Sequence, residues 1–202
     1  LSAIDDFLSD MYENEDTRIE LLSDCYAKGF GDFALKNLIK EIYEFTRSLK
    51  EPKEWLKESA LMYKDFKKSI WYEFLTKNGD FEKYGFSDTD EEIKMYNEGI
   101  YPVISVLCEV ICEFSQYYFN KKQEKNNFEF NDLEHMCYEL LRDFSEVREE
   151  YSNKYDEILM DEYQDTNALQ DGIFSLISDK KFMVGDMKQS IYRFRNSDPL
   201  IF

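Results

Sequence analysis

The chain has 202 residues, 43% of them hydrophobic and 17% aromatic, enough to build the core of one domain, or of one domain and part of another. Its seven glycines and three prolines are too few for a loop-rich, disordered or all-β chain, and they favour a mainly helical fold. The formal net charge of −18 argues against a broad nucleic-acid surface, because phosphate contacts need lysine and arginine.

Apolar side chains recur at helical spacing through residues 1–150, and this pattern predicts a succession of amphipathic helices packed around a core. Residues 29–31 (Gly-Phe-Gly) interrupt the pattern, and Pro52 predicts a helix start because proline suits the first turn. The side chains expected in the core of this first half are Ile4, Phe7, Leu8, Met11, Ile19, Leu22, Tyr26, Leu35, Leu38, Ile39, Ile42, Tyr43, Phe45, Trp55, Leu56 and Met62.

Turn-forming residues between 78 and 88 predict a loop, after which a long helix is expected from Glu91 towards Lys122. Pro102 is expected to kink this helix. Residues 131–134 (Asn-Asp-Leu-Glu) resemble a capping box and predict the start of the next helix. The face of the long helix expected in the core carries Tyr96, Ile100, Val103, Leu107, Ile111, Phe114 and Tyr118.

The four cysteines form no CxxC pair and His135 is the only histidine, so no zinc site is expected. Cys108 and Cys112 lie four residues apart in a helical pattern, as buried free thiols often do. No apolar stretch reaches the roughly 18 residues that a membrane span needs, and no secretory signal is recognisable. These features predict a cytoplasmic protein without a membrane partner.

The pattern changes after Tyr155. Residues 158–160 and 182–184 are short apolar runs on either side of a helical pattern at 168–177, which predicts two short, buried, parallel strands of an α/β sheet. Residues 180–202 contain five basic and two acidic side chains, a net charge of +3, which leaves −21 on residues 1–179. Any surface that faces DNA is therefore expected to be local.

The first apolar run ends in two adjacent acids, Asp161 and Glu162. An apolar strand that delivers carboxylates to the carboxyl edge of a parallel sheet can serve a metal bound to phosphate. In such a pair the first acid can hold Mg²⁺, usually through water, and the second can orient and deprotonate the attacking water. The pair alone is weakly specific in a chain with 43 acidic residues, where a solvated surface pair is the ordinary interpretation.

The neighbouring residues are more specific. Residues 161–167 (DEYQDTN) resemble the signature of UvrD/Rep-type superfamily 1 DNA helicases, and residues 184–195 (VGDMKQSIYRFR) resemble their motif III, in the expected order and at the expected spacing. Within this family the likeness is closest to the AddA (RexA) subunits of bacterial ATP-dependent helicase/nucleases, with RecB-like proteins as the nearest competitor. It rests on Met187-Lys188 and residues 196–202, and more loosely on residues 45–56 and 130–135.

The resemblance implies roles in ATP hydrolysis for three residues. Asp161 would coordinate Mg²⁺ and Glu162 would be the catalytic base. Gln189 would sense the γ-phosphate of ATP and couple the nucleotide to the DNA site.

It also implies a DNA-binding group in motif III. Tyr192 and Phe194 would stack on single-stranded bases, a contact worth roughly 1–3 kcal/mol per base. Arg193 and Arg195 would meet the phosphate backbone. The alternative for the two aromatic side chains is packing against the sheet, and for Arg193 it is a solvated surface position.

The sequence contains no GxxxxGK[ST] phosphate loop and no recognisable nuclease motif. The resemblance implies that residues 1–150 are a multi-helix insertion of the first motor domain and residues 151–202 a partial RecA-like ATPase domain. We therefore expect a fragment that binds no cofactor and is inactive by itself, from a parent that uses ATP and Mg²⁺. Its two strands are expected to leave apolar faces and edges uncovered.

Three functional interpretations stay open. The first is a segment of an ATP-dependent 3′–5′ translocase with exonuclease activity, which acts on single- and double-stranded DNA in double-strand-break repair with an AddB-like partner. The second is a non-catalytic helical module that binds DNA or a partner protein. The third, an unrelated helical adaptor, requires that Asp161 and Asp186 do not lie at strand ends.

Overall fold

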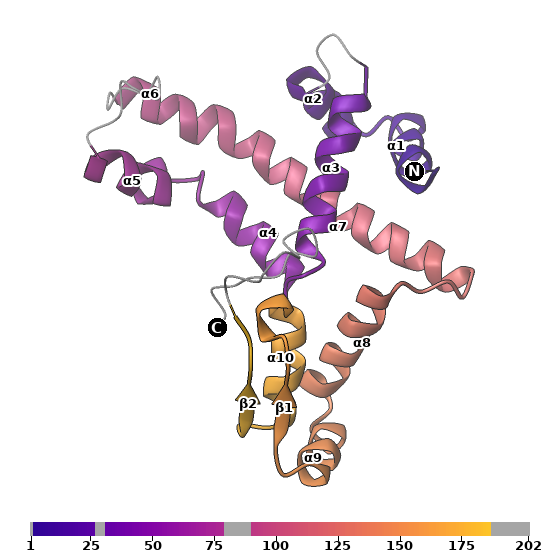
Figure 1. The fold of residues 1–202 in the computed structure, drawn as a ribbon. Helices are drawn as coiled ribbons and strands as arrows, with labels where there is room; N and C mark the ends of the chain where they lie inside the picture. Colours follow the sequence, from indigo (N-terminus) through magenta and orange to yellow (C-terminus); the bar gives the residue numbers. More distant parts are fainter. Residues whose placement is uncertain (1, 27–30, 79–89, 187–202) are drawn as a thin grey trace. The chain divides into compact units, whose positions relative to one another are not determined.

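A computed structural model describes residues 2–26, 31–78 and 90–186 of the chain. These residues are mainly helical and carry one small parallel sheet, as the composition predicts (Figure 1). The helices are α1 (Ser2–Glu13), α2 (Thr17–Tyr26), α3 (Phe33–Thr46), α4 (Pro52–Leu61), α5 (Ile70–Asn78), α6 (Asp90–Met95), α7 (Tyr101–Glu124), α8 (Phe130–Asp143), α9 (Ser145–Lys154) and α10 (Ala168–Ile177), and the strands are β1 (Ile158–Met160) and β2 (Lys181–Met183). The chain divides into two compact units, residues 1–43 with 53–121 and residues 44–52 with 122–202.

The first unit is built around a core to which α1, α2, α3, α4 and α7 contribute. The predicted apolar stripes supply most of it, and Leu22, Leu35 and Ile39 are fully buried. Arg18 on α2 reaches α7, where its Nη1 lies 2.6 Å from Oε1 of Glu113. The amphipathic patterns therefore predicted this packing correctly, because burying an apolar stripe is the main stabilising contribution to such helices.

Three side chains that were expected in this core are exposed. Trp55 (37% exposed) adjoins Leu56 (3% exposed), and consecutive residues point about 100° apart around a helix, so both cannot face the core. Phe45 follows the buried Tyr43 by two residues and lies on the opposite side of α3. Met62 comes just after the last residue of α4.

The long helix predicted from Glu91 is formed by α6, a π-helical segment (Tyr96–Ile100) and α7 in succession. Pro102 stands in the first turn of α7, directly after the π-helical segment. Proline has no N–H to donate to the preceding turn, and the helix is irregular at that turn. The thiols of Cys108 and Cys112 on α7 are half-buried, and burial raises the pKa of Cys108 to about 11.

The capping box predicted at residues 131–134 is wrong by two residues. α8 begins at Phe130 after Glu129, and the Asp132 carboxylate accepts a hydrogen bond from the Glu129 N–H at 2.8 Å. The other Asp132 oxygen lies 2.5 Å from Nζ of Lys122, at the end of α7. This buried ion pair fixes Asp132 at the third helical position, and so fixes where α8 begins.

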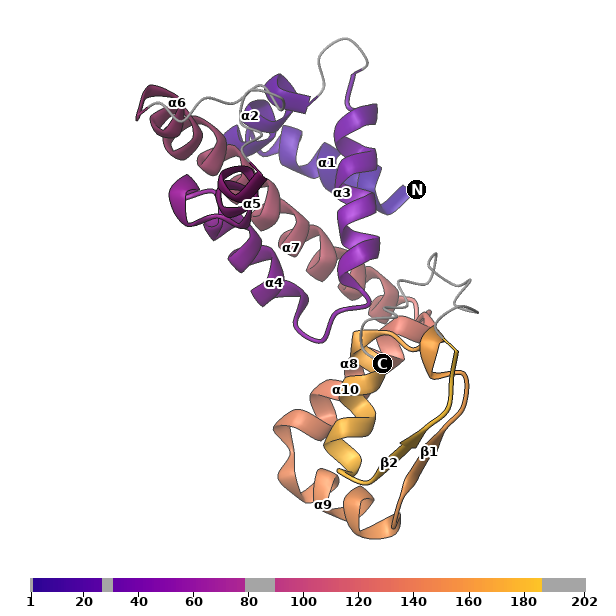
Figure 2. The ribbon, with the colours of Figure 1, turned by 60° about the vertical axis from the view of Figure 1, so that its left-hand side comes forward.

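The second unit holds the sheet. β1 and β2 pair in parallel, with Met160 opposite Met183, and α10 connects them and lies along one face (Figures 1 and 2). Leu159 (72% exposed) and Phe182 (58% exposed) are uncovered, so the strands are not buried as their apolar sequences predicted. The expectation that the sheet leaves apolar faces uncovered is confirmed. No described helix has the length and apolar character of a membrane span.

Candidate functional site

The predicted acids lie at the carboxyl ends of the two strands. Asp161 directly follows β1, and Asp186 follows β2 by three residues. The Val184 N–H donates to the carbonyl oxygen of Met160 at 2.8 Å and extends the pairing beyond β2. Because the strands are parallel, both acids belong to one edge of the sheet. This placement contradicts the interpretation as an unrelated adaptor, which required these acids to lie elsewhere.

The backbone turns sharply at Glu162, which has left-handed dihedral angles (φ 51°, ψ 41°). The Asp161 Oδ1 atom accepts a hydrogen bond from the Glu162 N–H at 2.9 Å. A 3₁₀ turn (η4, Tyr163–Asp165) follows, and both acidic side chains stay exposed. A non-glycine residue in this conformation costs about 1–3 kcal/mol and is often found at functional sites. The turn leaves both carboxylates at the tip of β1, accessible to a ligand.

Other residues of the signature at 161–167 stabilise the fold. Tyr163 is buried and donates a hydrogen bond from its hydroxyl to Asp171 on α10 at 2.8 Å; burial raises the pKa of Tyr163 to about 12. Asn167 caps α10, since its Oδ1 accepts from the Gln170 N–H at 2.9 Å. The aromatic ring and the amide cap thus anchor the turn that presents the two acids.

Gln164 connects the two strand ends, a role that sequence reasoning did not assign. Its side chain is 2% exposed. Its Nε2 donates a hydrogen bond to Oε2 of Glu162 at 2.6 Å, and its Oε1 accepts one from the Asp186 N–H at 2.9 Å. The only signal in the sequence is its position within the signature, because the contact with Asp186 depends on how the strands pair.

The two carboxylates fit one part of a magnesium–nucleotide site. Mg²⁺ is commonly bound through one or two carboxylates together with substrate phosphates and water. Asp161 and Glu162 supply such carboxylates, and the described ranges contain no group of three or more potential ligands that would form a site by themselves. Asp161 would hold the metal ion. The phosphate side would need a loop that the printed sequence does not contain.

The remaining predicted site residues lie outside the described residues. They are Gln189, Tyr192, Arg193, Phe194 and Arg195.

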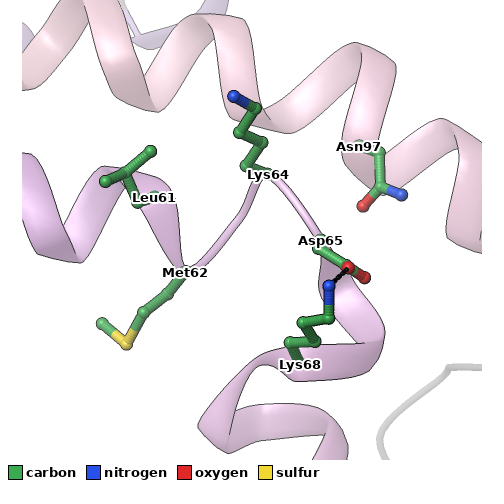
Figure 3. Close-up of a pocket in the computed structure, with 6 residues that line it drawn as sticks. All are labelled: Leu61, Met62, Lys64, Asp65, Lys68 and Asn97. Atoms are coloured by element: carbon green, nitrogen blue, oxygen red, sulfur yellow. Dashed lines mark ion pairs between the residues drawn. The ribbon is translucent and has the colours of Figure 1, made fainter.

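A separate hollow of about 540 Å³ lies in the first unit (Figure 3). It is lined by Leu61, Met62, Lys64, Asp65, Lys68 and Asn97. Lys68 pairs with Asp65 at 2.8 Å, and Asn97 accepts a hydrogen bond from the Phe66 N–H at 2.9 Å, so these polar groups are satisfied within the protein. None of the residues predicted for catalysis lines this hollow.

The family model of the UvrD/REP helicase N-terminal domain matches residues 8–202, and the chain belongs to this family. Among its relatives are proteins named as AddA subunits of ATP-dependent helicase/nucleases. The chain is 44% identical to that of Thermoanaerobacter sp. (strain X514) over 133 residues, which are 60% of this chain and 11% of the relative. It is 34% identical to that of Clostridium perfringens (strain ATCC 13124) over 182 residues, 83% of this chain and 13% of the relative.

The chain therefore spans about a tenth of the length of these relatives. The match confirms the resemblance to UvrD/Rep-type helicases that the signature and motif III predicted. The names of the relatives agree with the likeness to AddA subunits.

Proposed function

We propose that the chain is a segment of the first motor domain of a longer, cytoplasmic helicase/nuclease subunit. That subunit would be an ATP-dependent 3′–5′ translocase on single-stranded DNA that acts in double-strand-break repair with an AddB-like partner. The observation that supports this most is the pair of exposed carboxylates, Asp161 and Glu162, at the carboxyl end of β1. In this proposal residues 1–150 are the helical insertion and residues 151–202 belong to the ATPase domain.

The chemistry follows from the positions of the two carboxylates. Asp161 holds Mg²⁺, which when bound neutralises charge on the nucleotide phosphates. Glu162 orients the attacking water and accepts its proton, and the short hydrogen bond from Gln164 Nε2 fixes one oxygen of that carboxylate. The printed sequence has no phosphate loop, so this chain by itself does not hydrolyse ATP.

The residues of motif III complete the proposed site. Gln189 senses the γ-phosphate and couples it to the DNA. Tyr192 and Phe194 stack on single-stranded bases, a mode of binding that tolerates any sequence. Arg193 and Arg195 contact the phosphate backbone, in the part of the chain that carries net positive charge despite an acidic whole.

The complete subunit provides the test. Its ATP hydrolysis is expected to rise on addition of single-stranded DNA, and it is expected to displace streptavidin from the 5′ end of a biotinylated strand but not from the 3′ end. Hydrolysis that does not respond to DNA, or displacement from the 3′ end alone, would contradict the proposal. A strand with biotin at both ends, labelled differently, provides the internal control for polarity.

A further inference from the structure

The side-chain amide of Gln164 lies between two groups that belong to different strand ends. One is the Glu162 carboxylate, whose Oε2 accepts from Nε2 of Gln164 at 2.6 Å. The other is the backbone N–H of Asp186, which donates to Oε1 of Gln164 at 2.9 Å. A neutral amide suits this position, because it offers a donor to a carboxylate and an acceptor to an N–H at the same time.

We propose that Gln164 is a positioning residue that orients the Glu162 carboxylate and ties it to the segment after β2. The side chain is 2% exposed, so water competes little for these two hydrogen bonds. The hydrogen bond to Glu162 involves a charged acceptor and is short, as charge-assisted hydrogen bonds are. The left-handed backbone of Glu162 adds a second constraint, so both the backbone and the carboxylate of this residue are held.

This arrangement links two functions of the proposed motor. Asp186 stands three residues before Gln189, in the segment that the proposed function assigns to nucleotide sensing and DNA contact. A shift of that segment moves the N–H that Oε1 of Gln164 accepts from, and the same amide then changes how it holds Glu162. Gln164 thereby makes the orientation of the base depend on the position of motif III. The inference rests on the proposed role of Glu162 as the base.

The test uses Gln164→Met in the complete subunit. Methionine is unbranched and similar in length, and it removes both hydrogen bonds. We expect kcat for ATP hydrolysis in the presence of single-stranded DNA to fall about 10–100-fold, as for loss of an outer-shell contact that orients a catalytic group. The KM for ATP is expected to change less than about threefold, since the lost contact serves the reacting state.

Tyr163→Phe is the matched control for loss of a buried hydrogen bond in the same turn. It removes the bond from the tyrosine hydroxyl to Asp171 and leaves Gln164 and Glu162 in contact. We expect its kcat to stay within about threefold of the unchanged subunit, because the lost bond supports the fold and does not orient the base. An equal loss in both variants would overturn the proposal, because it would show that any weakening of this turn lowers the rate.

The double variant Glu162→Gln/Gln164→Met separates positioning from an independent role. If Gln164 acts through Glu162, adding Gln164→Met to Glu162→Gln lowers kcat no further, because the carboxylate to be positioned is already gone. Losses that multiply would overturn the inference and leave the proposed function intact. A Glu162→Gln variant with full activity would instead show that the proposed function itself is wrong.

Discussion

Glu162→Gln in the complete subunit is expected to lower kcat for DNA-stimulated ATP hydrolysis by about 10²–10⁴-fold, the contribution typical of a general base. Glutamine has nearly the same shape, and its side-chain oxygen can still accept the hydrogen bond from Gln164. The substitution therefore removes the proton acceptor and leaves most of the geometry in place. Steady-state hydrolysis at saturating ATP and DNA measures the effect, and ATP binding is expected to persist.

Glu157→Gln is the matched control for loss of one negative charge. Glu157 is exposed and comes just before β1, at the opposite end of the strand from Glu162. Its replacement is expected to leave kcat unchanged within experimental error. A comparable loss of rate in the two variants would show that the general acidity of this region matters and that Glu162 has no special role.

The second large effect concerns stability. Lys122 is 5% exposed, with Nζ 2.5 Å from Asp132 and 3.2 Å from Glu129. Lys122→Met is expected to lower the free energy of unfolding by roughly 3 kcal/mol, because it leaves the buried Asp132 carboxylate without this cation. The effect falls at the lower end of the range for broken buried pairs, since Arg47 Nη2 lies 3.8 Å from Asp132. Urea unfolding of the chain, followed by circular dichroism, measures it.

Two further variants define the cause of that loss. Lys125→Met removes an exposed lysine just after α7 and is expected to change the free energy of unfolding by less than about 0.5 kcal/mol. Lys122→Met/Asp132→Asn removes both charges but keeps an oxygen that can accept from the Glu129 N–H, so it is expected to recover much of the lost stability. A double variant less stable than Lys122→Met would contradict the role of the buried charge.

Local pattern predicted most of the helical fold but not which neighbour in a pair of apolar residues is buried. Leu56 and Trp55 are both apolar, yet only Leu56 faces the core, since the two point in different directions. The start of α8 was predicted two residues late because a local capping pattern contains no information about Lys122, which binds Asp132 from another helix. Long-range contacts override local preference in both cases.

At the candidate site, the sequence predicted that Asp161 and Asp186 end two parallel strands, because short apolar runs before acidic residues are typical of such edges. The hydrogen bonds of Gln164 could not be predicted in the same way. One of them spans 22 residues and forms only because β1 and β2 pair in a particular register. The exposure of Leu159 was inferred from uncovered sheet faces and not from its own apolar character.

The central claim is that the two adjacent carboxylates have separate tasks, one for the metal ion and one for water. A titration of ATP hydrolysis with Mg²⁺ in the complete subunit tests this most directly. Asp161→Asn is expected to raise the Mg²⁺ concentration for half-maximal activity by about 10–100-fold. Glu162→Gln is expected to keep that concentration near its original value and to lower the plateau. An unchanged Mg²⁺ requirement in Asp161→Asn, or the same response in both variants, would contradict the claim.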